Sequence, residues 1–262
     1  SYYEAYEQGR DLESIIQEIL VVYEDHKDQA PFDLKRFSDF SQMRERVAMK
    51  LIHTKSNETL LKEIPSIPFH DLSIVFYLFL DKDEHGQMTV LIRNDHLPIW
   101  NTDTSELYKL AIDNTPRLYP PCIRSMASLI NDMLFVNGTL IQPSFAAASQ
   151  NALDLTDTPI PLSILTNTSG IFGASAMLYP GVLKEFSKKI GHDLIILPSS
   201  VHEVLLLPYD STYSFQEMAD MVKDVNEKCV PVEEQLSNQV YYYSSAQDSI
   251  FLGGDPASRI LS

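Results

Sequence analysis

The sequence contains little cysteine. Among its 262 residues only Cys122 and Cys229 occur, and neither belongs to a Cys-x-x-Cys motif or to a cluster with histidine. A disulfide framework and a structural zinc site are therefore both disfavoured. Reduced thiols are typical of cytoplasmic proteins, and we expect a cytoplasmic location.

Long apolar stretches are also missing. The longest runs, such as Ile74–Leu80, are far too short to cross a bilayer. The first residues do not show the pattern of a secretory signal peptide. These absences predict a soluble protein without a membrane partner.

Basic residues are outnumbered, since 20 Lys and Arg stand against 36 Asp and Glu, which gives a formal net charge of −16. A protein with this negative charge repels the phosphates of nucleic acid, so direct binding to nucleic acid is disfavoured. Nine of the acids lie within residues 1–34, against two basic residues. An acidic decoy or inhibitor of a nucleic-acid-binding protein would share this charge and stays an alternative.

Signature motifs for metals and nucleotides are absent as well. The sequence has no His-Glu-x-x-His pattern, no calcium-binding EF-hand loop and no glycine-rich phosphate loop followed by lysine. We therefore predict neither a metal site nor a cofactor.

Apolar periodicity predicts an α+β fold with an N-terminal amphipathic helix. Apolar residues recur at helical spacing within residues 3–26, and we assign residues 1–44 to an N-terminal helical segment. Residues 45–133 then form a first α+β module, 134–159 a linker, and 160–262 a second module with the C-terminal tail.

The two modules are predicted to be similar, because the order strand, helix, hairpin, helix occurs in both. Both hairpins are entered by the string His-Asp-Leu, at residues 70–72 and again at 192–194. Three matched residues arise easily by chance, so the internal repeat rests on the order of the elements.

Gly170 and Gly173 lie between a predicted strand and a predicted helix. Backbone amides at the start of a helix are able to hold an anion, which makes these glycines candidates for ligand binding. A tight turn with close packing is the simpler interpretation.

The densest group of catalytic residue types is Ser199, Ser200, His202 and Glu203. A hydroxyl, an imidazole and a carboxylate are the parts of a hydrolytic site, provided that the base reaches the nucleophile. Successive side chains of a strand point to opposite faces, so His202 and Glu203 are expected to diverge. A polar hairpin turn explains the same residues.

A second polar run contains Arg93, Asn94 and His96 and is followed by Trp100. An arginine at the end of a strand beside an aromatic ring is able to bind a small anion or carboxylate. The arginine would equally form a salt bridge with a neighbouring acid.

Several phrases stand out along the sequence. They are Leu178-Tyr-Pro-Gly-Val-Leu-Lys-Glu185, Leu197-Pro-Ser-Ser-Val-His-Glu-Val204, Ile92-Arg-Asn-Asp-His-Leu97 with Trp100, Asn114-Thr-Pro-Arg-Leu118 and Val240-Tyr-Tyr-Tyr243. In combination they resemble an uncharacterised bacterial family, domain of unknown function 5688. The resemblance implies a bacterial, cytosolic protein. It implies no activity and no site residues.

The leading functional hypothesis is a non-enzymatic binding or regulatory module, because no convergent set of nucleophile and base or of metal ligands is visible. A protein is a possible partner, and a cleft between the two modules is the expected site. The alternatives are a hydrolase with an unrecognised Ser/His site and the acidic decoy.

Overall fold

The computed structural model describes residues 39–83, 86–126, 162–198 and 200–254, with five isolated positions between 10 and 17. The chain divides into two compact units, Ser1–Met43 and Arg44–Ser262. In the first unit, helix α4 spans Phe40–Met43. The helix predicted over residues 3–26 lies outside the described residues apart from those five positions, and so does the whole predicted linker.

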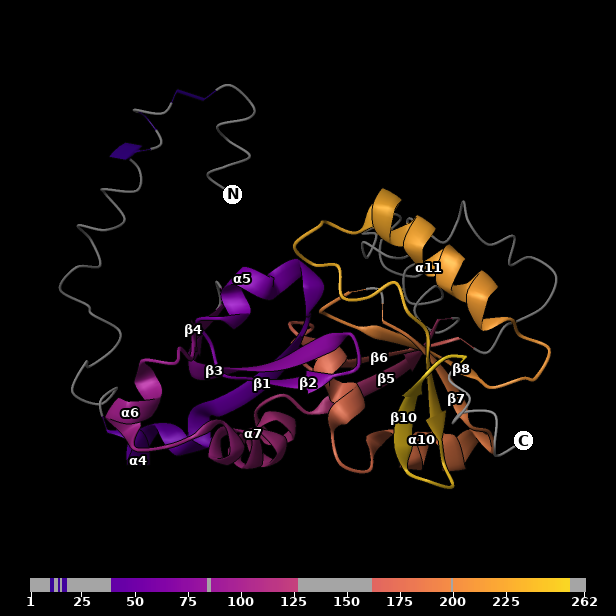
Figure 1. Cartoon of the computed structure of the whole chain (residues 1–262), viewed down its shortest axis with the longest axis horizontal. Helices are drawn as coiled ribbons and strands as arrows, with labels where there is room; N and C mark the ends of the chain where they lie inside the picture. Colours follow the sequence, from indigo (N-terminus) through magenta and orange to yellow (C-terminus); the bar gives the residue numbers. More distant parts are fainter. Residues whose placement is uncertain are drawn as a thin grey trace. The chain divides into compact units, whose positions relative to one another are not determined.

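The first sheet of the larger unit is antiparallel and has four strands (Figure 1). They are β1 (Val47–His53), β2 (Ser66–Phe69), β3 (Leu72–Asp83) and β4 (Gly86–Leu91). Strand β3 is central because it pairs with β1 along one edge and with β2 and then β4 along the other. Its continuous apolar run predicts this buried position.

Strand β2 was not predicted, because Pro65 and Pro68 favour an interruption. Pro68 pairs opposite Ser73 in the antiparallel register of β2 and β3. Proline is tolerated in a strand at the edge of a sheet, where its missing N–H is not needed for pairing. The short length of β2 and its edge position thus explain why the local signal failed.

The helical elements of this part of the chain are η1 (Arg44–Arg46), η2 (Lys55–Asn57), α5 (Glu58–Leu61), α6 (His96–Trp100) and α7 (Thr104–Leu118). Helix α7 begins after Asp103, because the side chain of Asp103 accepts a hydrogen bond from the backbone N–H of Glu106 at 2.8 Å.

Helix α7 continues through Pro116 to Leu118, although proline inside a helix removes one backbone hydrogen bond. Its last turn is anchored on the outer edge of β1. The hydroxyl of Thr115 accepts a hydrogen bond from the backbone N–H of Met49 at 3.1 Å. The side-chain amide of Asn114 donates a hydrogen bond to the backbone carbonyl of Val47, also at 3.1 Å. These tertiary bonds offset the helical hydrogen bond that proline removes.

The second sheet has six antiparallel strands in the order β10-β9-β7-β8-β6-β5. They are β5 (Pro121–Ser125), β6 (Ser163–Asn167), β7 (Leu194–Leu197), β8 (Val204–Pro208), β9 (Tyr241–Ser244) and β10 (Ser249–Leu252). Strand β5 falls within the predicted first module, yet it pairs with β6.

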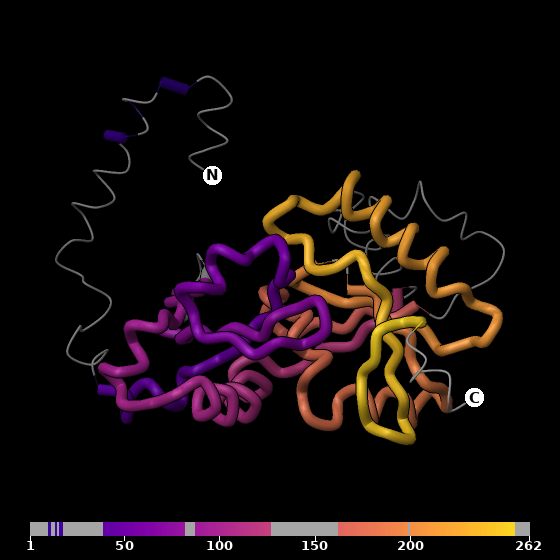
Figure 2. The backbone as a smooth tube through the Cα atoms, viewed as in Figure 1, coloured from indigo at the N-terminus to yellow at the C-terminus, as the bar shows by residue number. Residues whose placement is uncertain are grey.

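Helices cover both faces of the six-stranded sheet (Figures 1 and 2). They are the 3₁₀ segment η3 (Gly173–Leu178), α10 (Val182–Ile190) and α11 (Phe215–Cys229). Met218 and Val222 of α11 pack on one face, in a core that includes Ile195 and Leu205. The helix predicted after Gly173 is formed as two segments, η3 and α10, which are separated at Pro180, and α10 ends at Gly191 in a left-handed conformation.

The α+β class is confirmed, whereas the similarity of the two modules is not. Both halves contain a strand, a helical segment, a hairpin and a helix in that order. The pairing differs, since β1 pairs with the first strand of its hairpin, β3, while β6 pairs with the second strand, β8.

The three consecutive tyrosines of β9 are all buried, and each hydroxyl donates to an aspartate. Tyr241 donates to Asp71, Tyr242 to Asp193 and Tyr243 to Asp248. Asp71 and Asp193 are the aspartates of the two His-Asp-Leu strings. The tyrosines therefore have structural partners, which accounts for their burial.

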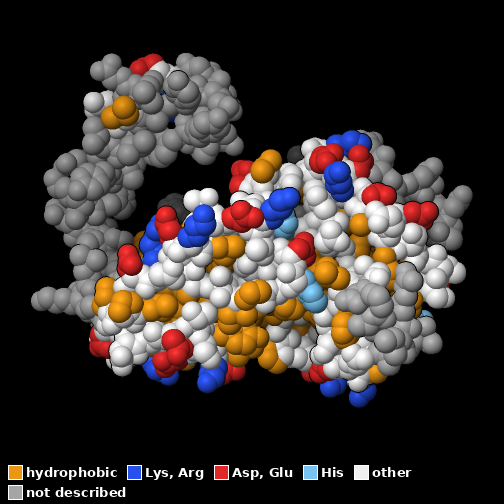
Figure 3. All heavy atoms as spheres, in the orientation of Figure 1, with side chains coloured by type: hydrophobic (Ala, Val, Ile, Leu, Met, Phe, Trp, Pro, Cys, Tyr) orange, Lys and Arg blue, Asp and Glu red, His pale blue; other side chains and the backbone are white. Residues whose placement is uncertain are grey.

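On the face drawn in Figure 3, acidic and basic side chains are interspersed over the described residues. Among those residues no helix combines the length and the apolar character needed to cross a membrane.

Candidate functional site

Arg93 and Asn94 contact the two residues that follow α5. The guanidinium of Arg93 lies 2.5 Å from the carboxylate of Glu63, and both side chains are more than half exposed. The side-chain amide of Asn94 donates to the carbonyl of Lys62 at 3.0 Å. An exposed ion pair of this kind contributes little stability, and it occupies the arginine that was a candidate for anion binding.

His96 and Trp100 belong to the short helix α6. Their rings lie 5.1 Å apart, and Trp100 is buried. The Nδ1 atom of His96 accepts the backbone N–H of Arg93 at 3.1 Å. Burial and the nearby Arg93 charge lower the pKa of His96, so the neutral imidazole is favoured. The indole is part of the core, and it offers no exposed face for a ligand.

The loop that contains Gly170 is closed by Asn167. The side-chain oxygen of Asn167 accepts the backbone N–H groups of Ser169 and Gly170, each at 2.9 Å. Because both N–H groups already donate to this oxygen, they are not available to a bound anion. Gly170 has a φ of +70°, which glycine adopts without strain.

Gly173 supports the interpretation as close packing. A Cβ atom at this position would meet the Thr166 hydroxyl and the carbonyl of His202, and would lie 2.8 Å from the backbone nitrogen of Asn167. Glycine is required here because η3 packs directly against β6. The two glycines thus serve the turn and the packing of the loop.

The proposed serine and histidine pair is engaged in other bonds. Ser199 lies outside the described residues. The hydroxyl of Ser200 accepts the backbone N–H of His202 at 3.0 Å. The imidazole Nδ1 of His202 accepts the backbone N–H of Phe172 at 3.3 Å, and its Nε2 lies 3.6 Å from the Glu234 carboxylate.

The carboxyl group of Glu203 has a shifted pKa. Burial raises the pKa of its carboxyl group above the ordinary value, and the side chain makes no hydrogen bond or ion pair with another described residue. A carboxyl with a raised pKa is a recognised sign of a functional site, although a structural position produces the same shift.

The two polar runs are not brought together. Helix α6, which contains His96 and Trp100 of the first run, and the β7–β8 hairpin, which contains the second, lie apart in the larger unit (Figure 1). A cleft shared by residues 92–100 and 197–204 is therefore not formed.

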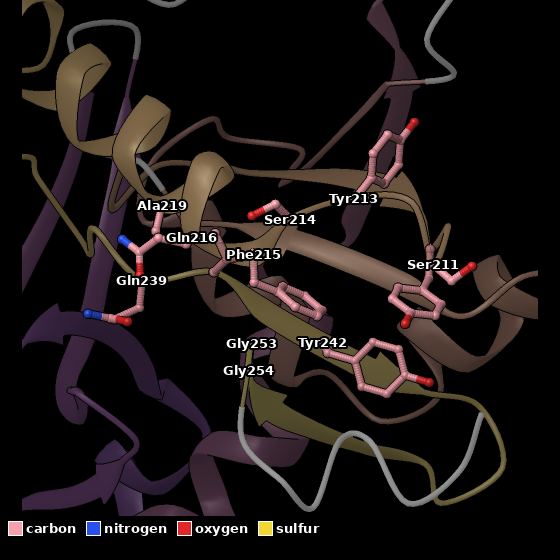
Figure 4. A pocket seen from close by; sticks show the side chains of 12 residues that line it. Ser211, Tyr213, Ser214, Phe215, Gln216, Ala219, Gln239, Tyr242, Gly253 and Gly254 are labelled. Atoms are coloured by element: carbon pink, nitrogen blue, oxygen red, sulfur yellow. The ribbon is translucent and has the colours of Figure 1, made fainter.

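The structure instead contains a pocket that the sequence analysis missed (Figure 4). It has a volume of about 430 Å³ and lies where the start of α11 meets β9 and the end of β10. Twelve residues line it: Tyr209, Ser211, Tyr213, Ser214, Phe215, Gln216, Ala219, Gln239, Val240, Tyr242, Gly253 and Gly254. This volume is within the range of sites for small ligands.

Three aromatic rings form the apolar part of this pocket. Tyr209 stacks on Phe215 with ring centroids 6.2 Å apart, and it meets Tyr242 edge-on at 5.0 Å. Gly253 lies against the Phe215 ring, so closely that a Cβ atom there would approach it to 2.5 Å. Each ring is therefore fixed by its neighbours.

The polar part of the pocket consists of hydroxyl and amide groups. The side chains of Ser211, Tyr213 and Gln239 make no hydrogen bond to another described residue. Ser214 caps α11, because its hydroxyl accepts the amide of Glu217 at 3.3 Å. The lining contains no acidic, basic or histidine side chain. These rings and polar groups come from segments far apart in the sequence, so no local motif signals the pocket.

No group of three or more His, Cys, Asp or Glu side chains suited to a metal ion occurs within the described ranges. Both cysteines are free thiols.

Comparison with known proteins identifies one family. No curated protein matches the sequence. No solved structure matches it either. The model of the family of unknown function DUF5688 matches residues 1–245, which include every phrase that carries the resemblance. The chain therefore belongs to the DUF5688 family.

Proposed function

We propose that the protein is a non-enzymatic binding module that holds a small, uncharged ligand in the pocket between α11 and the β9–β10 hairpin. The observation that carries this proposal is the composition of the lining. Aromatic faces from Tyr209, Phe215 and Tyr242 occur together with hydroxyl and amide groups, without a charged side chain. Pockets for small molecules typically combine an apolar wall with a few polar groups.

The lining also indicates the chemistry of the ligand. Ring faces cover the apolar face of a flat or ring-shaped molecule. Hydroxyl and amide groups both donate and accept hydrogen bonds, so Ser211 and Gln239 suit a ligand that carries hydroxyl groups. A charged ligand would be desolvated without a counter-charge, which is costly. A neutral compound of the size of a monosaccharide or nucleoside fits these constraints.

The two alternative functions receive less support from the described residues. The hydroxyl of Ser200 accepts a bond from the backbone of His202, and the imidazole Nδ1 is bonded to Phe172; neither bond is the nucleophile–base bond that a hydrolase needs. The interspersed charges of Figure 3 do not favour a mimic of nucleic acid on that face. A cytoplasmic, bacterial location remains our proposal from the sequence.

A thermal-shift screen with neutral monosaccharides, nucleosides and their phosphate esters tests the binding proposal. A ligand that binds only the folded state raises the unfolding temperature. We expect a rise with at least one neutral compound and a smaller rise with its phosphate ester, because the pocket lacks a cation.

Substitutions then locate the site. Gln239→Ala is expected to reduce the shift, because it removes an unpaired amide from the pocket. Gln247→Ala is the matched control, since Gln247 is exposed and outside the pocket lining. A shift that survives both Gln239→Ala and Phe215→Ala, or the absence of any shift with the neutral compounds, would contradict the proposal.

A further inference from the structure

Asp193 contacts the pocket at α11 from outside. It precedes strand β7 and is not among the residues that line the pocket. One oxygen of its carboxylate accepts a hydrogen bond from the hydroxyl of Tyr242, which is a lining residue. The other oxygen accepts the backbone N–H of Ser245 at 2.9 Å and the Ser245 hydroxyl at 2.5 Å. The carboxylate therefore connects a pocket ring with the turn between β9 and β10.

The backbone of Asp193 holds a second residue of the pocket. Its carbonyl accepts the N–H of Tyr209 at 2.8 Å, which extends the pairing of β7 with β8 by one step beyond Leu194 and Pro208. The rings of Tyr209 and Tyr242 are in edge-on contact. Two of the three aromatic residues in the pocket wall are thus bonded to the same residue, one through its backbone and one through its side chain.

The group that accepts the Tyr242 hydroxyl is charged. Burial alone would raise the pKa of Asp193, but hydrogen bonds from Ser245 and Tyr242 outweigh burial, and the pKa lies below its ordinary value. The carboxylate is therefore negative at neutral pH. Hydrogen bonds to an ionised acceptor are about twice as strong as bonds between neutral groups. The Tyr242 side chain is thus held at both ends, by the backbone of β9 and by the bond at its hydroxyl.

We infer that Asp193 is a positioning residue, which raises the affinity of the pocket for its neutral ligand by holding the Tyr242 ring in place. The inference rests on the proposed function, because it requires a ligand in this pocket. A side chain that is already fixed loses little freedom when a ligand binds, whereas a loose ring has to be ordered at a cost in affinity. The ligand therefore gains affinity from a carboxylate that does not line its pocket.

The neighbouring pair of Tyr243 and Asp248 supplies a control of the same chemistry. The hydroxyl of Tyr243 donates to the carboxylate of Asp248 at 2.6 Å. Successive side chains of a strand point to opposite faces of the sheet, so Tyr243 points away from the face that carries Tyr242. Neither Tyr243 nor Asp248 lines the pocket. Loss of this second bond should lower stability and leave the pocket wall unchanged.

A double-mutant cycle measured by ligand affinity tests the inference. Each neutral compound that raises the unfolding temperature serves as a probe, beginning with glucose and adenosine. Isothermal titration calorimetry gives its Kd for the folded full chain at neutral pH. We expect Tyr242→Phe and Asp193→Ala each to weaken binding by about threefold to tenfold, the effect of one side chain that has to be ordered. The double variant should bind no more weakly than either single variant, because both changes break the same bond.

Tyr243→Phe and Asp248→Ala are expected to bind the probe as the wild type does. Tyr242→Phe and Tyr243→Phe each remove one hydroxyl that donates to an aspartate, so a general loss of stability would weaken binding alike in both. Equal losses of affinity in these two variants would therefore overturn the inference. Unchanged affinity in Tyr242→Phe and Asp193→Ala would overturn it as well and would leave the proposed function intact. If no neutral compound binds the wild type, the proposed function fails and the inference fails with it.

Discussion

The hydroxyl of Tyr241 donates a hydrogen bond to the carboxylate of Asp71, and the tyrosine ring is fully buried. The two residues are 170 positions apart in the sequence. Tyr241 belongs to the six-stranded sheet, and Asp71 to the turn between β2 and β3 of the four-stranded sheet. Ser237 donates to the same carboxylate at 2.6 Å. Asp71 thus ties the two sheets together.

Tyr241→Phe is expected to lower the free energy of unfolding by about 1.5–3 kcal/mol, the usual range for a hydrogen bond to a charged group. Urea denaturation followed by circular dichroism measures this change. Tyr243→Phe is the matched control, because Tyr243 is also buried but its partner Asp248 is 48% exposed. Equal losses in the two variants would show that Asp71 has no special role.

Asp193 is expected to contribute stability that acid removes. Burial raises the pKa of this carboxyl, but hydrogen bonds from Ser245 and Tyr242 outweigh burial, and the net pKa lies below the ordinary 3.8. A lowered pKa in the folded state stabilises the protein above the unfolded-state value, and this stability is lost as pH falls through the folded-state value.

Asp193→Asn should therefore be less stable than the wild type at about pH 6, and the difference should shrink as pH falls below 3.8. Urea denaturation at several pH values measures it. A difference that is independent of pH would mean that Asp193 acts through packing and not through its charge.

The sequence predicted most of the elements that carry local signals. Asp103 and Ser214 cap α7 and α11 through hydrogen bonds to residues three positions later, and both caps were visible as short motifs. The apolar run of β3 likewise predicted a central strand. Such features depend on residues close in the sequence, so a single sequence is enough to find them.

The candidate site was not predicted, for a physical reason. Runs of polar residues suggested chemistry at 92–100 and 197–204, but many of those side chains satisfy nearby backbone groups. The pocket is built from Tyr209, Phe215, Tyr242 and Gly253, which only the sheet order brings together. From the sequence alone, an aromatic residue that lines a pocket cannot be distinguished from one that is buried in the core.

The pKa of Glu203 is shifted in the opposite direction to that of Asp193, so we predict the opposite pH dependence of stability. Burial raises its pKa above the ordinary 4.5, so its contribution to stability is present below the unfolded-state value and is lost as pH rises through the folded-state value. Glu203→Gln should be more stable than the wild type at neutral pH, and this advantage should disappear below 4.5. A less stable variant at neutral pH would reveal a partner for the ionised carboxylate.

The close packing of Gly173 predicts a large effect of one methyl group. In Gly173→Ala the new Cβ meets backbone atoms of β6 and of the segment before β8, which cannot move aside easily. We expect a loss of about 3 kcal/mol, the upper end for overpacked sites. Gly191→Ala is the control, because its φ is +77° but open space surrounds it; its loss should be about 1–2 kcal/mol from backbone strain. Equal losses would mean that η3 moves away from β6 at little cost.

Tyr119 provides a test in which removing a hydroxyl increases stability. Tyr119 is 3% exposed, and its hydroxyl makes no hydrogen bond of normal geometry within the described part of the chain, although the Tyr77 hydroxyl is close enough to shift its pKa. A buried hydroxyl without a partner costs about 1–3 kcal/mol. Tyr119→Phe keeps the ring, which packs edge-on against Phe79 at 5.7 Å, and should raise the free energy of unfolding by about 1 kcal/mol.

The same urea experiment therefore has to give opposite signs for Tyr119→Phe and Tyr241→Phe. Both variants remove one oxygen from a buried ring, so the lost volume and the change in hydrophobicity are matched. The difference between them reports only on the partner of the hydroxyl, which is a carboxylate for Tyr241. If Tyr119→Phe instead lowers stability, the Tyr119 hydroxyl is bonded to the Tyr77 hydroxyl, to a water molecule, to a ligand or to a residue outside the described ranges, because only a lost hydrogen bond would reverse the sign.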